Sequence, residues 1–320
     1  MKKTIFGFAT LMSAVVLAAC GGGGTDTSGN NSGGNSNNKE ELTFPIATKN
    51  NDDAIEDGEL EAAVATDSQF KGLFQWEFYQ DSFDAAFMAP SHEALFASND
   101  DFRITDDGAA TLDLDQDTKK ATIKIKDNVK WSDGEDVTAD DVIFPYEIIG
   151  HKDYTGIRYD DTFRNIVGME EYHDGSADTI SGIKKVDDKT VEIEYKDVNP
   201  SMLQAGGGIW SYAAPKHTLE GIAIKDMESS DQVRKNPVTF GPYYMSNIVA
   251  GESVEYLPNE HYWNGTPKLK KITMKSVPTA SATEALNSKL YDMIFQMPTD
   301  TYDTYKEISG YTNLGREQTS

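Results

Sequence analysis

The residue with the clearest chemistry in this 320-residue chain is its only cysteine, Cys20, whose thiol could carry a lipid. Cys20 follows Leu17-Ala18-Ala19, the end of an apolar stretch that starts near Ile5 behind Lys2 and Lys3. This order of basic, apolar and small residues is typical of an export signal. The apolar stretch is shorter than the roughly 20 residues that span a bilayer. We therefore expect a cleaved leader and, because no second cysteine exists, a folded part without disulfides.

The segment Leu17–Cys20 resembles the lipobox of bacterial lipoproteins, in which the cysteine becomes the N-terminus and carries a diacylglycerol thioether. The resemblance implies a signal peptide over residues 1–19, lipidation of Cys20, and a place on the extracytoplasmic face of the cell membrane of a Gram-positive cell. Two acyl chains suffice for anchoring, since each buried methylene is worth about 0.8 kcal/mol. The alternative is an ordinary secretory signal with an incidental cysteine.

Residues 20–38 are almost entirely Gly, Ser, Asn and Thr, which bury too little apolar surface to fold. We expect a flexible tether with a reach on the order of 20 to 25 Å.

The chain carries a formal net charge of −24, which disfavours nucleic acid and anionic lipid headgroups as partners. Membrane attachment must then come from the lipid. The acidity favours solubility at the cell surface over capture of a cationic ligand.

Two patterns approach known metal sites and fail. His92-Glu93 begins an H-E-x-x-H zinc motif, but Phe96 stands where the second histidine belongs. The segment Asp113–Asp117 imitates an EF-hand loop, but Thr118 replaces the required glycine and Lys124 the bidentate glutamate. It is predicted to be a hairpin turn. Because no nucleophile elbow, P-loop or dinucleotide-binding motif occurs either, we expect no enzyme, no metal and no cofactor.

The elements that would position a binding site are short strands and a few helices. Glu59–Ala65 is an apolar run before a turn and predicts a strand. Thr111–Leu114 with Ala121–Ile125 predicts one hairpin, and Ile183–Val186 with Thr190–Tyr195 predicts a second. The alternation in the second hairpin indicates one buried and one solvated face.

A helix is predicted between the two hairpins. Thr138 can cap its N-terminus with Asp141 three residues on, and the following apolar residues fall on one side. Pro145 lies beyond the first turn, where a proline removes a backbone hydrogen bond at a cost of about 3 kcal/mol. We therefore expect a kink or a short first helical segment.

The C-terminal part predicts a βαβ unit. Lys271–Val277 and Asp292–Phe295 are strand-like, and Ser281 with Glu284 forms a capping box for a helix through Leu290. The two strands should be parallel, with a right-handed crossover. Ligands of such sheets bind beyond the C-terminal ends of the strands. This rule makes candidate ligand-binding residues of Phe295, Gln296 and Met297.

Several segments resemble the extracytoplasmic solute-binding proteins of family 5. The longest match is Ala121–Ile149, with its K-W-S-D-G and T-A-x-D-V parts, although Pro145 stands where a small polar residue is usual. Shorter matches resemble further family segments, and two other stretches look most like the oligopeptide-binding lipoproteins of lactic acid bacteria. These shorter matches are Ala214–His217, Phe240–Tyr243, Asn259–Leu269 and Ser288–Phe295, and the two lactic-type stretches are Asn165–Ile183 and Asn247–Asn259.

The resemblance implies an α/β fold, namely lobe I of a periplasmic-binding-protein-like receptor (type II, cluster C-like) with an inserted β-rich subdomain. The first segment of the lobe would cover residues 39–96, the inserted subdomain 97–204, and the second segment 205–320. Relatives continue through a second lobe, which is absent from this chain. We therefore expect an N-terminal fragment, the alternative being a frameshifted or incomplete gene product. Such a chain should bind its ligand far more weakly than a complete relative, which calorimetry can test.

The resemblance also implies contacts with a ligand. The helix-like segment Asp84, Ala85, Ala86, Phe87 and Met88 aligns loosely with the part of the family that lies beside the bound peptide backbone. The alternative is that Phe87, Met88 and Phe295 belong to the ordinary core. Trp210 follows three glycines and is expected to pack rather than to line the cleft.

The function implied is that of a lipid-anchored receptor that binds oligopeptides and delivers them to the transmembrane subunits of an ABC permease. Main-chain groups would bind the peptide backbone, and roomy pockets would accept varied side chains. Two alternatives stay open. One is a receptor of the same family for another solute, such as a signalling peptide, nickel or a sugar, and the other is a surface adhesin. The mass and heterogeneity of the retained ligand, and growth on peptides after gene deletion, distinguish them.

Overall fold

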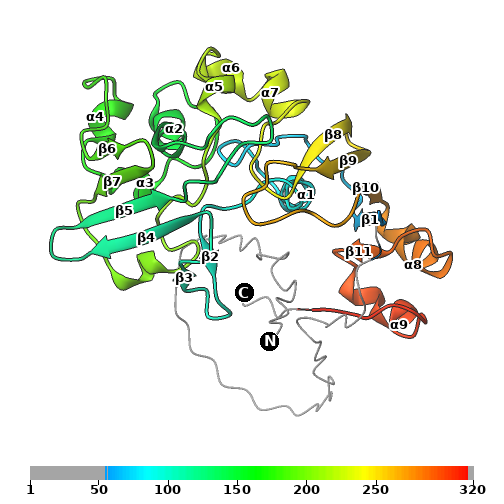
Figure 1. Ribbon diagram of the computed structural model, residues 1–320. Helices are drawn as coiled ribbons and strands as arrows, with labels where there is room; N and C mark the ends of the chain where they lie inside the picture. Colours follow the sequence, from blue (N-terminus) through cyan, green and yellow to red (C-terminus); the bar gives the residue numbers. More distant parts are fainter. Residues whose placement is uncertain (1–54, 56, 316–320) are drawn as a thin grey trace, which may run out of the picture.

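The computed structural model describes Ile55 and residues 57–315, which form two main β-sheets with helices around them (Figure 1). The leader, the tether and Cys20 lie outside the described residues. The two sheets are formed by strands from different parts of the chain. The strands are β1 (Glu59–Ala65), β2 (Ala97–Ser98), β3 (Ile104–Thr105), β4 (Ala110–Asp115), β5 (Lys120–Ile125), β6 (Ile183–Asp187), β7 (Thr190–Glu194), β8 (Tyr243–Val249), β9 (Ser253–Pro258), β10 (Lys271–Val277) and β11 (Met293–Phe295).

The first sheet has the strand order β11-β1-β10-β9-β8. Strand β1 is parallel to both β10 and β11, whereas β10, β9 and β8 pair in antiparallel fashion. The predicted strands Glu59–Ala65 and Lys271–Val277 are confirmed with the same bounds. The strands of the expected βαβ unit run parallel, but β1 lies between them. A strand more than 200 residues away in sequence fills the centre of the unit, a position that local pattern does not reveal.

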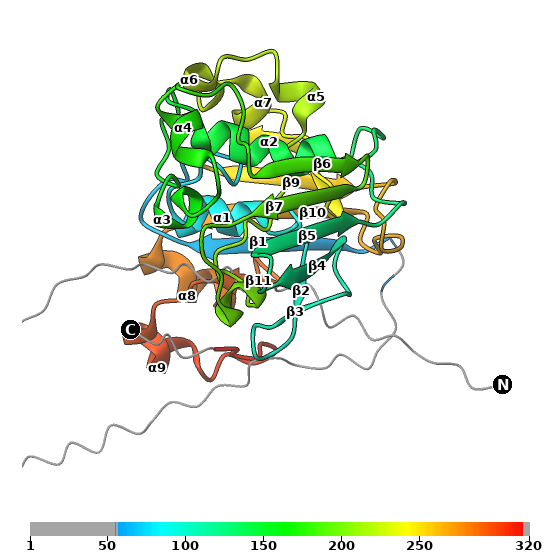
Figure 2. The same ribbon diagram turned by 90° about the vertical axis from the view of Figure 1, so that its left-hand side faces the viewer.

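The second sheet is antiparallel with the order β4-β5-β7-β6, so both predicted hairpins are confirmed. The helix α2 (Ala139–Gly150) packs against β6 and β7 (Figure 2). The turn of the first hairpin is held by Asp115, whose Oδ1 accepts hydrogen bonds from the N–H groups of Asp117 and Thr118. This is the hairpin turn expected in place of a calcium loop. Strands β2 and β3 form a separate small pair.

The helix α2 is not interrupted at Pro145, so the short first segment was wrong, whereas the kink stays a prediction. The predicted capping box is present: Asp141 Oδ2 accepts from the Thr138 N–H at 2.8 Å and from its hydroxyl at 3.0 Å. Proline removes the donor that would bond to the carbonyl oxygen of Asp141. That oxygen accepts instead from the N–H of Ala214 at 3.0 Å. A segment from outside the helix thus replaces the missing hydrogen bond.

The helix α8 (Thr279–Asn287) starts and ends earlier in the chain than predicted. The predicted capping box of Ser281 and Glu284 was wrong. Its first turn is capped by Asp67, whose oxygens accept from the Thr279 N–H at 3.0 Å and from the Thr279 hydroxyl at 2.5 Å. Because the cap comes from the loop after β1, it is invisible in the helix's own sequence.

The remaining helices are short and surround the two sheets. The helix α1 follows β1 in the chain, while most of the others belong to the segments between β5 and β8. They are α1 (Ser82–Met88), α3 (Asp161–Arg164), α4 (Met169–His173), α5 (Lys216–Leu219), α6 (Ile224–Met227), α7 (Asp231–Arg234) and α9 (Tyr302–Tyr305), with 3-10 turns at Pro200–Leu203 and Thr299–Thr301.

The segments that carry the family resemblance meet at one seam. Ser132 donates its N–H to the carbonyl of Thr239 at 2.7 Å, and the Asn259 side chain donates to the carbonyl of Gly241 at 2.9 Å. Gly241 also donates its N–H to the carbonyl of Ser91 at 3.0 Å. A Cβ on Gly241 would lie 2.3 Å from that oxygen, so only glycine permits this approach. The family motifs therefore act here as structural joints.

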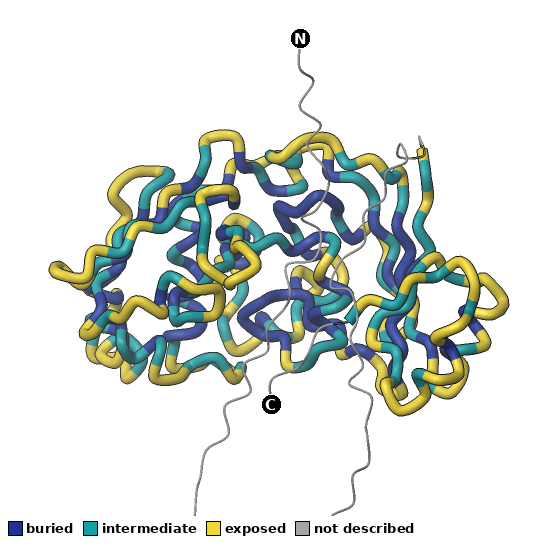
Figure 3. The backbone as a smooth tube through the Cα atoms, turned by 90° about the horizontal axis from the view of Figure 1, so that it is seen from below, coloured by how far each residue is buried: buried dark blue, intermediate teal, exposed yellow. Residues whose placement is uncertain are grey.

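Buried chain runs along the strands, and exposed chain collects in the loops at the rim (Figure 3). The strands of the four-stranded sheet all lie within residues 97–204, and those of the five-stranded sheet lie outside them. The apolar cluster around the four-stranded sheet also contains Leu95, Ile209 and Phe240. The two parts therefore share a continuous packed boundary, and the domain bounds given above stay a prediction.

Candidate functional site

The parallel strands β1, β10 and β11 end at one edge of the five-stranded sheet. Ala65 lies beside Val277, and Val64 lies beside Phe295, so the loops that follow these strands emerge together. Polar and ligand-binding groups collect at such an edge because the loops there are free to vary. This edge is the place that the sequence predicted for a ligand.

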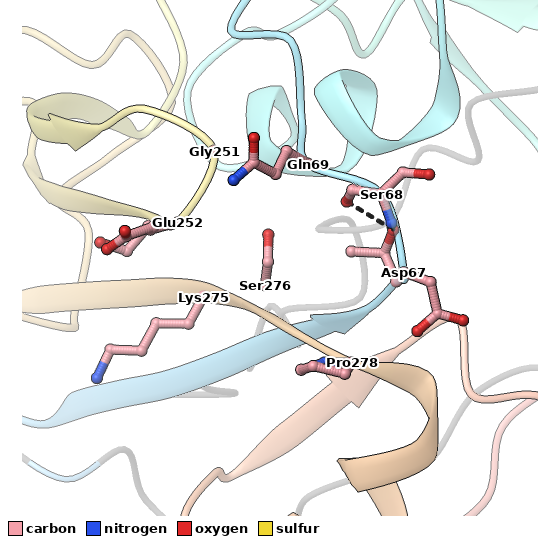
Figure 4. A pocket seen from close by; sticks show the side chains of 10 residues that line it. Asp67, Ser68, Gln69, Gly251, Glu252, Lys275, Ser276 and Pro278 are labelled. Atoms are coloured by element: carbon pink, nitrogen blue, oxygen red, sulfur yellow. Dashed lines mark hydrogen bonds between the residues drawn. The ribbon is translucent and has the colours of Figure 1, made fainter.

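A pocket of about 530 Å³ opens at this edge (Figure 4). Its walls come from three places: the loop after β1, the turn between β8 and β9, and the end of β10. The lining residues are Thr66, Asp67, Ser68, Gln69, Gly251, Glu252, Ser253, Lys275, Ser276 and Pro278.

The loop after β1 is held by a network of hydrogen bonds. Thr66 donates its N–H to the carbonyl of Val277 at 2.8 Å, and its hydroxyl accepts from the Ser68 N–H at 3.0 Å. Asp67 is fixed by its bonds to Thr279, and those bonds hold the pKa of the Asp67 carboxyl below its usual value. The rim is thus preorganised before any ligand arrives.

The side chains that line the pocket are mostly polar. The Ser276 side chain points into the space below Gln69, whereas Lys275 points away (Figure 4) and lies 3.6 Å from Glu61. The Ser276 hydroxyl is buried without a partner among the described residues. No histidine or cysteine is among the residues that line the pocket.

Histidine and carboxylate groups do not assemble into a metal site within the part of the chain that the structure describes. His92 is buried and uses both ring nitrogens: Nδ1 lies 2.8 Å from the Ser91 hydroxyl and Nε2 lies 2.9 Å from the carbonyl oxygen of Phe74. Burial lowers the pKa of His92 to about 4. Its neighbour Glu93 has a pKa raised to about 7, again by burial.

The predicted contact residues on α1 are mostly core. Phe87 and Met88 are fully buried, Ala85 is buried, and only Ala86 is partly exposed. Asp84 is fully buried as well, and burial raises the pKa of its carboxyl. Its two oxygens accept from the N–H groups of Gly72 at 2.9 Å and Leu73 at 3.2 Å.

The second predicted set follows β11. Phe295 and Met297 are half-buried and Gln296 is exposed, with a positive φ of 58°. Phe295 packs against the same apolar cluster as Phe87 and Met88, whereas Met297 packs against the cluster under α8. Neither predicted set lines the pocket. Both sets stay predictions as ligand contacts.

Trp210 packs with its ring edge-on to Phe163 and Tyr212, at centroid distances of 5.7 and 5.5 Å.

The sequence did not single out Gln69, Gly251 or Ser276 as site residues. The rule about strand ends would have found Gln69 and Ser276, since Gln69 lies in the loop after β1 and Ser276 lies near the end of β10. The turn that contains Gly251 joins antiparallel strands, and no local signal links it to this edge.

No helix in the described part of the chain is long and apolar enough to cross a membrane.

Residues 103–320 match the family model described as "Bacterial extracellular solute-binding proteins, family 5 Middle". A curated relative, the oligopeptide-binding protein OppA of Lactococcus lactis subsp. lactis, is 37% identical over 280 residues, which cover 86% of this chain and 47% of OppA. The oligopeptide-binding protein AppA of Bacillus subtilis (strain 168) is 31% identical over 189 residues, which cover 58% of this chain and 32% of AppA.

Solved structures agree with these relatives. Lactococcal OppA, complexed with an endogenous peptide in the closed conformation, has a TM-score of 0.77 and 37% identity, over 80% of this chain and 48% of that one. The AppA structure from Bacillus subtilis, in complex with a nonapeptide, has a TM-score of 0.65 at 22% identity, over 79% of this chain and 47% of that one, and shows the fold alone. The chain spans about half the length of the curated relatives it matches. The expected α/β, periplasmic-binding-protein-like fold is confirmed, and the chain belongs to the bacterial extracellular solute-binding proteins of family 5.

Proposed function

We propose that this chain is part of a lipid-anchored receptor that binds oligopeptides outside the cytoplasm and delivers them to an ABC permease. The observation that carries the proposal is the likeness to lactococcal OppA, an oligopeptide-binding protein whose solved structure contains a peptide. The likeness extends over 86% of this chain at 37% identity.

The geometry of the pocket supports a peptide as ligand. Serine, threonine and glutamine side chains line it, together with loop main chain that can bind the N–H and C=O groups of an extended peptide. The carboxylates of Asp67 and Glu252 lie at the same edge, with only Lys275 of opposite charge.

We assign supporting roles to the two predicted sets of contact residues. Asp84 holds the main chain of Gly72 and Leu73 from inside the fold, so α1 positions the loop that leaves the pocket rim. Phe295, Gln296 and Met297 extend the same edge beyond β11, where the exposed Gln296 is accessible to a ligand.

Anchoring through Cys20 is the second part of the proposal, and its support is the lipobox-like sequence before that residue. Labelling of cells with an alkyne fatty acid should mark the protein, and Cys20→Ala should abolish the label and release the protein from the membrane fraction. Unchanged labelling of the Cys20→Ala variant would refute anchoring at this residue.

Native mass spectrometry of the protein purified from its own cells tests the ligand. A ladder of retained peptide masses is expected for a general peptide receptor. A single retained species indicates a dedicated receptor, and a metal or sugar mass contradicts the proposal.

Growth on peptides as the source of an essential amino acid tests transport. A deletion strain that grows as well as its parent, with related receptors also deleted, would contradict a role in import.

A further inference from the structure

A second, much smaller cavity lies inside the protein, away from the pocket edge. It has a volume of about 10 Å³ and is walled by residues of four segments, near residues 75–93, at Trp131, at Ala213 and at 238–240. These segments belong to the seam at which the family motifs meet. A cavity of roughly 10 to 15 Å³ on this measure accommodates one water molecule.

Four of the residues around this cavity carry a buried polar atom that has no hydrogen-bond partner among the described residues. Leaving such an atom unpaired costs about 1 to 3 kcal/mol, so four of them in one place demand a partner. The atoms are Trp76 Nε1, Trp131 Nε1, Glu93 Oε2 and Thr239 Oγ1.

The chemistry of the four atoms is balanced. An indole N–H can only donate, so Trp76 and Trp131 supply two donors. Glu93 Oε2 and the Thr239 hydroxyl can each accept, which supplies two acceptors. A metal cation would face two indole N–H groups, and an anion would face a carboxyl group. A water molecule accepts two hydrogen bonds and donates two, so it alone matches the set.

We propose that this cavity is a binding site for one structural water, which accepts from Trp76 Nε1 and Trp131 Nε1 and donates to Thr239 Oγ1 and Glu93 Oε2. The surrounding chain is well held. Thr239 exchanges two hydrogen bonds with Ser132, its carbonyl accepting at 2.7 Å and its N–H donating to the serine hydroxyl at 3.3 Å.

The water would join parts of the fold that are far apart in sequence. The Trp131 ring lies edge-on to Phe240 at 5.5 Å, and the Trp76 ring lies edge-on to His92 at 6.4 Å. These contacts bring the rings to the same place but leave both indole N–H groups unbonded. The water supplies the hydrogen-bond partner that the ring contacts do not give to these two indole N–H groups.

Nuclear magnetic resonance of the full 320-residue chain tests the site through its indole protons. The Hε1 protons of Trp76 and Trp131 should show cross-peaks to water, with nuclear and rotating-frame Overhauser effects of opposite sign, which mark a water that tumbles with the protein. Trp210 is the control, because its Nε1 is also buried but the residue does not line the cavity. Missing cross-peaks at either Trp76 or Trp131, or equal cross-peaks at Trp210, would overturn the proposal.

A pair of variants at Thr239 tests the bonding pattern. Thr239→Val keeps the side-chain shape and removes one acceptor, so both cross-peaks should lose at least about half of their intensity as the water loses one of its four partners. Thr239→Ser keeps the hydroxyl and should retain them. Undiminished cross-peaks in the folded Thr239→Val protein would contradict the assignment of this hydroxyl.

Discussion

The carbonyl oxygen of Asp141 accepts a hydrogen bond from the N–H of Ala214 at 3.0 Å, in place of the donor that Pro145 lacks. The carboxylate of the same residue binds Thr138 on one side and the Lys216 N–H on the other, at 2.9 Å. Asp141 thus caps its own helix and holds a distant segment against it, and both tasks depend on its burial.

Replacement of this aspartate should destabilise the protein. Asp141→Ala removes the cap and leaves buried N–H groups unpaired, so we expect a loss of about 2 to 4 kcal/mol in the free energy of unfolding. The control is Asp140→Ala, next to it, which removes an exposed ion pair with Lys185 and should cost less than about 1 kcal/mol. Urea unfolding of both variants measures the difference, and equal losses would contradict the role of Asp141.

Gly241 should tolerate no side chain. Gly241→Ala places a Cβ 2.3 Å from the carbonyl oxygen of Ser91, and main chain must move to admit it. We expect a loss of about 2 kcal/mol or more. Gly221→Ala is the matched control, because nothing lies within 4 Å of the added Cβ. Thermal unfolding should separate the two variants, and a Gly241→Ala protein as stable as the control would show that the seam can relax.

Glu77 should make stability fall as the pH rises. Its carboxyl is fully buried, and burial raises its pKa to about 7 from an ordinary value of 4.5. The folded state therefore holds the proton more tightly than the unfolded state between these values. Relative to Glu77→Gln, the wild type should lose up to about 3 kcal/mol between pH 4.5 and pH 8. Parallel pH profiles of the two proteins would disprove this.

His92 should act in the opposite direction, at lower pH. Burial lowers its pKa to about 4 from 6.5, so the unfolded chain binds a proton that the folded chain refuses. Stability should therefore fall as the pH drops from about 6.5 to 4. Comparison with His92→Gln isolates this contribution, because the surface carboxylates titrate alike in both. The hypothesis is wrong if acidification destabilises the two proteins equally.

Gln69 should control access to the pocket at the strand edge. Its side chain packs beside Gly251 across the opening, so Gln69→Trp fills space that a peptide would occupy. We expect peptide binding at least tenfold weaker by calorimetry, which corresponds to about 1.4 kcal/mol. Gln232→Trp changes an exposed residue of α7 that does not line the pocket and should bind as the wild type does. Equal affinities of the two variants would place the ligand elsewhere.

Local sequence pattern by itself determined the strands Glu59–Ala65 and Lys271–Val277, both hairpins, and the capped start of α2. Each of these depends on neighbours in the chain, namely alternation, turn residues and a cap three residues from its partner. The resemblance to family 5 added the fold class.

The tertiary structure alone decided three other features. The donor for the Asp141 carbonyl comes from Ala214, the cap of α8 comes from Asp67, and the pocket combines the ends of β1 and β10 with the turn between β8 and β9. The sequence of a helix shows that some of its groups have no hydrogen-bond partner within the helix, but it does not show which distant group supplies the partner. Which distant group satisfies them follows from how the sheets pack, and that packing depends on burial across the whole chain.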